Sequence, residues 1–182
     1  MPVATDPPHE LQLVIDFVNT LDLEEGSEAL GSPVALASWL TARGLADPGL
    51  ALGSSELARA YTLREALRAV MLAHNGGPEA TLAPLQQEAE RSRLAVSFDD
   101  HCESVLAAQA SGFDGALGRL LIPVAEAAGD GSWLRVKACA DDGCRWAFYD
   151  ASRNRAGRWC DMAVCGNRNK VRSFRARSSD HR

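Results

Sequence analysis

Apolar residues recur at helical intervals along the segment HELQLVIDFVNTLDLEEG, residues 9–26. The apolar positions are Leu11, Val14, Ile15, Val18 and Leu21. Polar residues stand at similar intervals on the other side, at Gln12, Asp16, Asn19 and Thr20. A period near 3.6 residues is typical of an amphipathic helix with one buried side, so the pattern predicts a first helix through this segment.

Two further helices follow. One begins at Ser32, a favourable capping residue, has Pro33 in its first helical position and ends at Gly44. The next runs through SSELARAYTLREALRAVMLAHN and ends at the glycines that follow. Its charged residues, including Arg64 and Arg68, alternate with apolar ones, and we expect them on its solvated faces.

After residue 80 the sequence predicts a helix, a β-hairpin and a last helix. A helix from about Thr81 to Arg93 tolerates Pro84 in its first turn. LAVSF and ESVLAAQA then flank DDHC and predict a short β-hairpin, although the second arm is ambiguous. The run GFDGALGRLLIPVAEAAG, residues 112–129, predicts a last helix that is weakened or kinked near Pro123.

The turn GDGS at 129–132 is the best candidate boundary. We expect a mostly helical domain over residues 1–130 and a small module over 131–182, with a fold that is mainly α with a small β-hairpin (α+β). No apolar run approaches the roughly 18 residues of a membrane span, and the N-terminus lacks the pattern of a secretory signal. We therefore expect no membrane partner and a cytoplasmic location.

The net charge of −5 conceals an asymmetry between the two regions. Residues 1–134 hold nineteen Asp and Glu against seven Arg, which gives −12. Residues 135–182 hold twelve Lys and Arg against five acidic residues, which gives +7. A split of this kind suggests that the second region faces a polyanion.

Four of the five cysteines form two pairs, Cys139 with Cys144 and Cys160 with Cys165. Each pair encloses four residues, and fifteen residues separate the pairs. Structural disulfides belong to secreted proteins, and a redox pair usually encloses two residues. A closed four-thiolate site fits the spacing better, and zinc suits such sites. We expect one Zn²⁺ per chain with Cys102 outside the site; unliganded buried cysteines are the alternative.

The residues around the cysteines predict a small metal-dependent module. CADDGC forms a tight knuckle, RWAFYDAS a strand, RNRAG a polar turn and RWC the start of a returning strand. CGNRNKVRSFRARSS then predicts a basic helix that begins beside the last ligand. Knuckle, hairpin and helix in this order make a treble-clef-like arrangement. Because the module is too small for a core of its own, metal binding is expected to stabilise it.

This segment resembles the CGNR zinc finger, named for the run that stands here as Cys165–Gly166–Asn167–Arg168. The upstream segment LQLVIDFVNTLD is similar to the start of the ABATE domain, which commonly precedes this finger. The resemblance covers nearly the whole chain and implies a stress-induced transcriptional regulator. One departure is the run NRAGRW. The family tends to have consecutive basic residues here, whereas this chain has the uncharged Ala156 and Gly157 and so carries less positive charge at the turn.

Basic residues line the finger. We expect double-stranded DNA as a partner, contacted by Arg153, Arg155 and Arg158 on the hairpin and by Arg168, Lys170, Arg172, Arg175 and Arg177 on the helix. Arg168, Arg172 and Arg175 stand at i, i+4 and i+7 and share a helix face. The alternatives are that these charges solvate the module or dock against the acidic first region.

The polar side of the first helix, Asp16, Asn19 and Thr20, is a candidate site for a small-molecule effector; a solvated or internally hydrogen-bonded face is the alternative. The four histidines have no spacing suited to catalysis, and no phosphate-binding glycine motif occurs, so we do not expect an enzyme. Two functions remain. The first is a zinc-dependent DNA-binding regulator whose first domain senses a signal or forms a homodimer. The second is a protein-interaction or scaffolding module with a purely structural finger.

Overall fold

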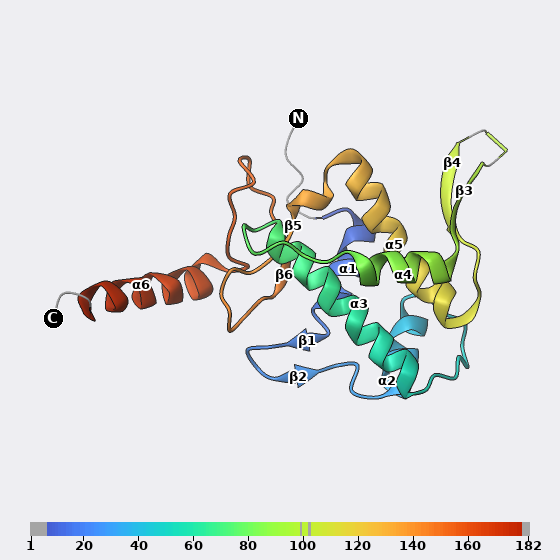
Figure 1. Cartoon of the computed structure of the whole chain (residues 1–182), viewed down its shortest axis with the longest axis horizontal. Helices are drawn as coiled ribbons and strands as arrows, with labels where there is room; N and C mark the ends of the chain where they lie inside the picture. The colour runs from blue at the N-terminus through green and yellow to red at the C-terminus, as the bar shows by residue number, and fades with distance from the viewer. Residues whose placement is uncertain (1–6, 99, 102, 180–182) are drawn as a thin grey trace.

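The computed structural model describes residues 7–98, 100–101 and 103–179 as a mainly helical α+β fold, as the sequence predicts (Figure 1). The helices are α1 (His9–Val18), α2 (Pro33–Ala42), α3 (Ser54–Ala73), α4 (Ala83–Ser92), α5 (Gly112–Asp130) and α6 (Asn167–Ser179). The short turns are η1 (Trp133–Arg135), a 3₁₀ turn, and η2 (Met162–Gly166), a π-helical turn. No helix in these ranges is both long and apolar enough to cross a membrane.

Within the part of the chain that the structure describes, the strands pair as three antiparallel two-stranded sheets. They are β1 (Leu21–Asp22) with β2 (Ser27–Glu28), β3 (Leu94–Phe98) with β4 (Ser104–Ala108), and β5 (Val136–Ala138) with β6 (Ala147–Tyr149). The β3–β4 pair is the hairpin that the sequence predicts. Figure 1 shows it standing out from the helical body at one end, while α6 reaches away from the body at the opposite end.

The core lies among α1, α2, α3 and α5. Its largest fully buried side chains include Phe17, Leu36, Leu63, Leu67 and Leu117. The predicted start of α2 is confirmed, because Ser32 Oγ accepts a hydrogen bond from the Ala35 N–H at 3.1 Å. The α5 helix is continuous through Pro123, whose missing N–H does not end it.

The first helix is shorter than its apolar pattern predicts, and the placement of Leu21 on the helical stripe is wrong. It ends at Val18, and Leu21 pairs with Glu28 in a strand instead of continuing the helical stripe. Arg68 Nη2 donates to the carbonyl of Val18 at 2.7 Å and to that of Leu21 at 3.3 Å. These carbonyl groups therefore bond a side chain from α3, so tertiary structure overrides the local periodicity.

The prediction that Arg64 and Arg68 lie on solvated faces is also wrong. Their side chains are each 3% exposed. Arg64 forms a two-pronged pair with Glu28 at 2.7 and 2.8 Å, and Arg68 pairs with Glu65 at 3.1 Å. Burial lowers the pKa of Arg68, while Glu65 counteracts that effect. Because each guanidinium has partners, both can remain inside the fold.

The C-terminal region shares the core of the helical body. Trp133, Val136, Ala138 and Ala147 belong to the same buried apolar cluster as the side chains of α1, α3 and α5. His74 at the end of α3 contacts the Trp133 ring edge-on, with the ring centres 5.5 Å apart. The hydrophobic core therefore crosses the sequence boundary near residue 130.

Candidate metal centre

The four paired cysteines meet at one point. Their Sγ atoms all lie within 4.8 Å of one another, with Cys144 and Cys160 3.5 Å apart and Cys160 and Cys165 3.8 Å apart. A tetrahedral site with Zn–S bonds of about 2.3 Å requires sulfurs roughly 3.8 Å apart. Trp146 and Trp159 pack against this cluster. The four sulfurs fit one zinc ion, and Cys102 lies outside the described residues.

The electrostatics of the cluster also call for a cation. Burial, reinforced by the neighbouring thiols, raises the pKa of Cys160, and the same causes raise that of Cys165 to about 12. Four thiolates cannot share so small a volume without a positive ion to offset their repulsion. Zinc supplies that charge and holds the thiolates together, which is the role of a structural site.

The first two ligands flank a tight knuckle organised by Asp141. Its carbonyl accepts from the N–H groups of Cys144 and Arg145 at 2.9 and 3.0 Å, and its carboxylate accepts from the N–H of Gly143 at 3.1 Å. Arg145 takes a left-handed conformation with φ of 51°. The knuckle is thus closed by its own backbone, and it returns the chain into β6.

The hairpin of the finger differs from the one predicted. The partner of β6 is β5, which precedes the first ligand, so the strands flank the knuckle; residues 158–160 do not form a returning strand. The carbonyl of Arg158 instead accepts from the Ala140 N–H at 3.0 Å and from Nδ2 of Asn75, in the helical body, at 2.8 Å. These contacts hold the segment that leads to the third ligand.

The loop after β6 is built on a buried ion pair. Lys137 Nζ lies 2.7 Å from Asp150 Oδ2, and both side chains are about 5% exposed or less. Burial alone would raise the pKa of Asp150, but Lys137 and hydrogen bonds from Ser152 and Gly157 lower it to about 2. A Cβ on Gly157 would lie 2.7 Å from the Asp150 carboxylate, so the loop requires glycine there.

The run Cys165–Gly166–Asn167–Arg168 joins the metal to the last helix. Asp161 caps η2 by accepting from the N–H groups of Ala163 and Val164. A Cβ on Gly166 would lie 2.5 Å from Met162 Sδ and 3.2 Å from the Trp159 ring, so glycine permits close packing beside the ligand. Asn167 Nδ2 donates to the carbonyl of Ala163 at 2.9 Å. Cys165 thus supplies a ligand, while Gly166 and Asn167 stabilise the η2 turn that contains it.

Comparison with protein families agrees with both parts of this architecture. The family described as "Putative stress-induced transcription regulator", ABATE, matches residues 11–130, and the CGNR zinc finger matches residues 135–178. The chain belongs to the ABATE family, with a CGNR zinc finger after the ABATE region. The two descriptions name a regulator and a zinc finger, and neither describes an enzyme. A search of curated proteins finds no significant match.

The CGNR finger is tied to the ABATE region by hydrogen bonds that sequence patterns did not reveal. Asn19 exchanges two hydrogen bonds with the backbone of Ala147, at 2.8 and 2.9 Å. Arg68 Nη1 donates to the carbonyl of Arg145 at 2.9 Å, and Asn75 Nδ2 donates to that of Ala138 at 2.8 Å. The sequence pattern instead predicts Asn19 in a candidate effector site.

The cations predicted to bind nucleic acid fall into two structural groups. Arg168 pairs with Glu24 and, at 3.5 Å, with Asp141; Arg172 Nη1 lies 3.0 Å from Asp141. The Asp141 side chain is fully buried, and although burial would raise its pKa, the Gly143 N–H and Arg172 lower it. The Arg172 side chain is nevertheless 55% exposed, and the other predicted cations, Arg153, Arg155, Arg158, Lys170, Arg175 and Arg177, are exposed as well. The structure thus gives Arg168 and Arg172 contacts inside the protein.

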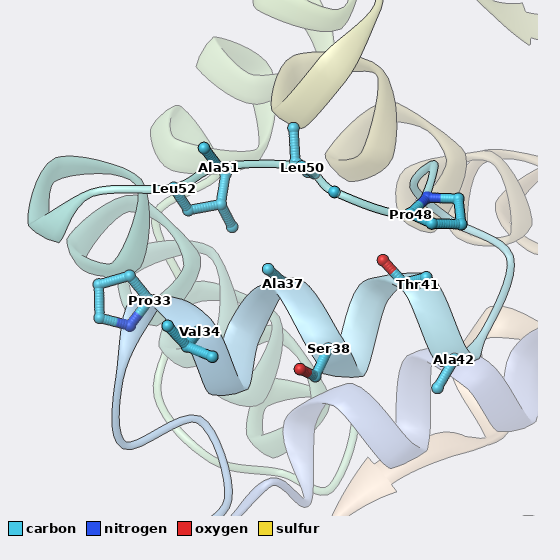
Figure 2. A pocket seen from close by; sticks show the side chains of 11 residues that line it. Pro33, Val34, Ala37, Ser38, Thr41, Ala42, Pro48, Leu50, Ala51 and Leu52 are labelled. Atoms are coloured by element: carbon cyan, nitrogen blue, oxygen red, sulfur yellow. The ribbon is translucent and has the colours of Figure 1, made fainter.

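The three candidate effector residues do not line one hollow. Asn19 bonds Ala147, and Thr20 Oγ1 donates to the Phe17 carbonyl at 2.7 Å and accepts from Arg64 at 3.0 Å. Asp16 lines a hollow of about 560 Å³ between α1 and α5. Figure 2 shows a second hollow, of about 650 Å³, between α2 and residues 48–52, lined mainly by apolar side chains such as Val34, Ala37 and Leu50.

Proposed function

We propose that this protein is a zinc-dependent, DNA-binding transcriptional regulator of the cytoplasm, in which the CGNR finger contacts double-stranded DNA. The observation that carries the proposal is the position of α6, which begins beside the metal ligand Cys165 and reaches away from the body (Figure 1). Its thirteen residues make a rod of roughly 20 Å. A helix of that size can enter the major groove of B-DNA.

The charge of the finger supports a polyanionic partner. Lys170 and Arg177 stand seven residues apart and share a helix face, and both are exposed. Arg153 and Arg155 are exposed on the loop that the Lys137–Asp150 pair organises. Arginine and lysine at such positions neutralise phosphates and release counterions, which makes binding steeply dependent on salt.

Within this proposal the arginines have different tasks. Arg168 and Arg172 meet the buried carboxylate of Asp141, which lies in the knuckle between Cys139 and Cys144. They orient α6 relative to the zinc site, so they act as positioning residues. Contact with DNA falls to Lys170, Arg175 and Arg177 and to the loop residues Arg153, Arg155 and Arg158.

Fluorescence anisotropy of the full, zinc-loaded chain with mixed-sequence duplexes tests the proposal. Binding at low salt should weaken as salt rises, and chelation should abolish it. Lys170→Ala and Arg177→Ala should each lower the salt slope by about one unit. Arg91→Ala, which removes an exposed cation of α4, is the matched control and should bind like the unchanged chain. Absence of duplex binding at low salt would overturn the proposal.

The interaction-module reading rests on a different observation, which is that acidic side chains already bind the first turns of α6. Glu24 of the ABATE region and Asp141 of the knuckle both pair with Arg168. An acidic protein partner could extend the same set of contacts along the helix. A chain that fails to bind duplex yet binds an acidic peptide with the same Lys170 and Arg177 dependence would support this second function.

For signal reception, we assign the effector to the hollow beside Asp16. It combines the carboxylates of Asp16 and Glu126 with the cations of Arg43 and Arg119 around the apolar Ile122. Such a mixture suits a small zwitterionic or polar molecule. A thermal-shift screen of small metabolites should find stabilising compounds whose effect is lost in Asp16→Ala and kept in Ser38→Ala, which changes the hollow of Figure 2 instead.

A further inference from the structure

The outer half of the β3–β4 hairpin carries an uncovered apolar face. Leu94, Val96 and Phe98 alternate along β3, so their side chains share one face of the ribbon. Leu94 is half-buried at the base, whereas Val96 is 60% exposed and Phe98 is 73% exposed. Across the ribbon, Val96 pairs with Leu106, which extends the same face. Two bulky side chains therefore point into solvent from an element that stands away from the body (Figure 1).

The strands also lack the devices that usually protect a sheet edge. The sequences LAVSF and SVLAA contain no charged residue and no proline, and among the described residues their sheet has only two strands. Natural proteins normally place lysine, proline or a bulge on an exposed edge, because unpaired backbone groups otherwise recruit other strands. A two-stranded ribbon is only marginally stable in water without a third strand or a packing surface. These features indicate that the edge of this ribbon pairs with another β-strand.

An apolar hollow begins where this face ends. It measures about 460 Å³ and lies among α3, α4 and α5, and Leu94 is one of its lining residues. Most of the other lining side chains are apolar, among them Leu82, Leu85, Ala89, Leu121 and Val124. Leu82 is 60% exposed at this hollow. The apolar face of β3 therefore leads directly into an apolar hollow of the same chain.

We infer that a second copy of this chain covers both features, by antiparallel pairing of β3 with its counterpart about a two-fold axis at Val96. This register aligns all five residues of β3 and sets Val96 against Val96 of the partner copy and Leu94 against Phe98. Phe98 of one copy then lies beside Leu94 of the other, at the hollow that Leu94 lines, and the two-fold axis repeats the contact. A strand without charge suits this symmetry, because a charged residue on the axis would face its own copy.

The pairing makes a four-stranded sheet with one continuous apolar face. Three or more strands with a hydrophobic face reach the stability that a lone ribbon lacks. Both partners contribute the same β3 edge, so this contact is complete in a dimer and leaves no further β3 edge to pair. Dimerisation through this hairpin is independent of DNA, since α6 lies at the opposite end of the molecule (Figure 1).

Sedimentation equilibrium of the zinc-loaded full chain without DNA is the test. The unchanged chain should be a dimer at micromolar concentration. Val96→Lys should be monomeric, because it places two ammonium groups face to face at the axis. Phe98→Ala should weaken the dimer by about a hundredfold or more, since one phenylalanine is withdrawn from each of two apolar sites. Val34→Lys, which alters a valine on α2 that is 75% exposed, is the matched control and should stay dimeric.

A cysteine variant distinguishes loss of the interface from misfolding, because it tests the pairing by forming a bond and not by losing the dimer. Residues directly opposite in an antiparallel pair have Cα atoms about 4.5–5.5 Å apart, which lies within the range of a disulfide. In a Cys102→Ser background, Val96→Cys should form a disulfide-linked dimer under mild oxidation, and Val34→Cys should not. A monomeric unchanged chain, or a dimer that survives Val96→Lys and leaves Val96→Cys unlinked, would overturn the inference. Either result leaves the DNA-binding proposal standing, because the two are measured separately.

Discussion

Asn19 pairs with the backbone of Ala147, a residue 128 positions later, as a neighbouring strand would. Nδ2 of Asn19 donates to the Ala147 carbonyl and Oδ1 accepts from its N–H, at 2.9 and 2.8 Å. Ala147 is almost fully buried and lies in β6, between two metal ligands in the sequence. A side chain at the end of the first helix therefore provides hydrogen-bond partners for the backbone N–H and carbonyl of a strand in the zinc finger.

Replacing this amide tests the link between the two regions. Asn19→Ala leaves the buried N–H and carbonyl of Ala147 without those partners, which should lower the free energy of unfolding by about 1–3 kcal/mol or more. Urea denaturation of the zinc-loaded chain measures the change. Asn154→Ala, an exposed asparagine in the finger loop, is the control and should remain within about 0.5 kcal/mol of the unchanged chain. Equal effects of the two substitutions would contradict a specific role for Asn19.

The metal content separates ligand cysteines from the fifth cysteine. Elemental analysis of reduced protein should give one zinc per chain, because four sulfurs lie within 4.8 Å of one another. Cys160→Ser should lose the metal, whereas Cys102→Ser, prepared in parallel, should retain it. Less than about half an equivalent in the unchanged chain would count against the site.

The Lys137–Asp150 pair predicts strong coupling between two residues. Lys137→Met and Asp150→Asn should each destabilise the fold by about 3–5 kcal/mol, because each leaves a buried partner uncompensated. The double variant should lose clearly less free energy of unfolding than the two single variants lose together. A double-mutant cycle at neutral pH measures this difference. Glu25→Gln, an exposed carboxylate, is the control for loss of one negative charge. Additive costs would show that the pair contributes no interaction of its own.

His74 predicts a loss of stability in mild acid. Burial lowers the pKa of this residue, although its hydrogen bond to the Val136 carbonyl at 2.9 Å counteracts the effect. The unfolded chain, with an ordinary histidine pKa near 6.5, then binds more protons than the folded one. The contribution of His74 is therefore present above that value and is lost as the pH falls below it.

The measurement compares the unchanged chain with His74→Asn, whose amide can still donate to Val136. Urea midpoints taken from pH 7.5 to 5.5 should fall less in the variant. His9→Asn is the control, because it removes a histidine at the exposed start of α1 and should leave the dependence unchanged. Identical pH dependence in the unchanged chain and His74→Asn would refute the assignment.

Sequence patterns predicted those elements whose structure is determined by residues close together in the chain. Ser32 with Pro33 defined the start of α2, and LAVSF with its partner run defined the β3–β4 hairpin. The cysteine spacing identified all four members of the metal cluster, since each knuckle closes within its own few residues. These features depend on sequence neighbours, so the sequence alone sufficed.

The remaining features depend on contacts between distant residues. The early end of α1 and the burial of Arg64 and Arg68 arise together, because those arginines bond Thr20 and Leu21, just after α1. The strand partner of β6 is β5, and the carbonyl of Arg158 bonds Asn75 and Ala140 instead of a residue of β6. No periodicity records such pairings, which is why the helix was predicted too long and the finger hairpin misplaced.

The separation of charge along the chain has a kinetic consequence. Acidic residues dominate the ABATE region and basic residues the CGNR finger, and α6 projects at one end of the molecule (Figure 1). The protein therefore carries a large electric dipole. In the field of a polyanion the dipole rotates the molecule before contact, so that α6 arrives first and the ABATE region trails. Encounters become oriented rather than random, and added salt should slow their rate more than it shortens the lifetime of the complex.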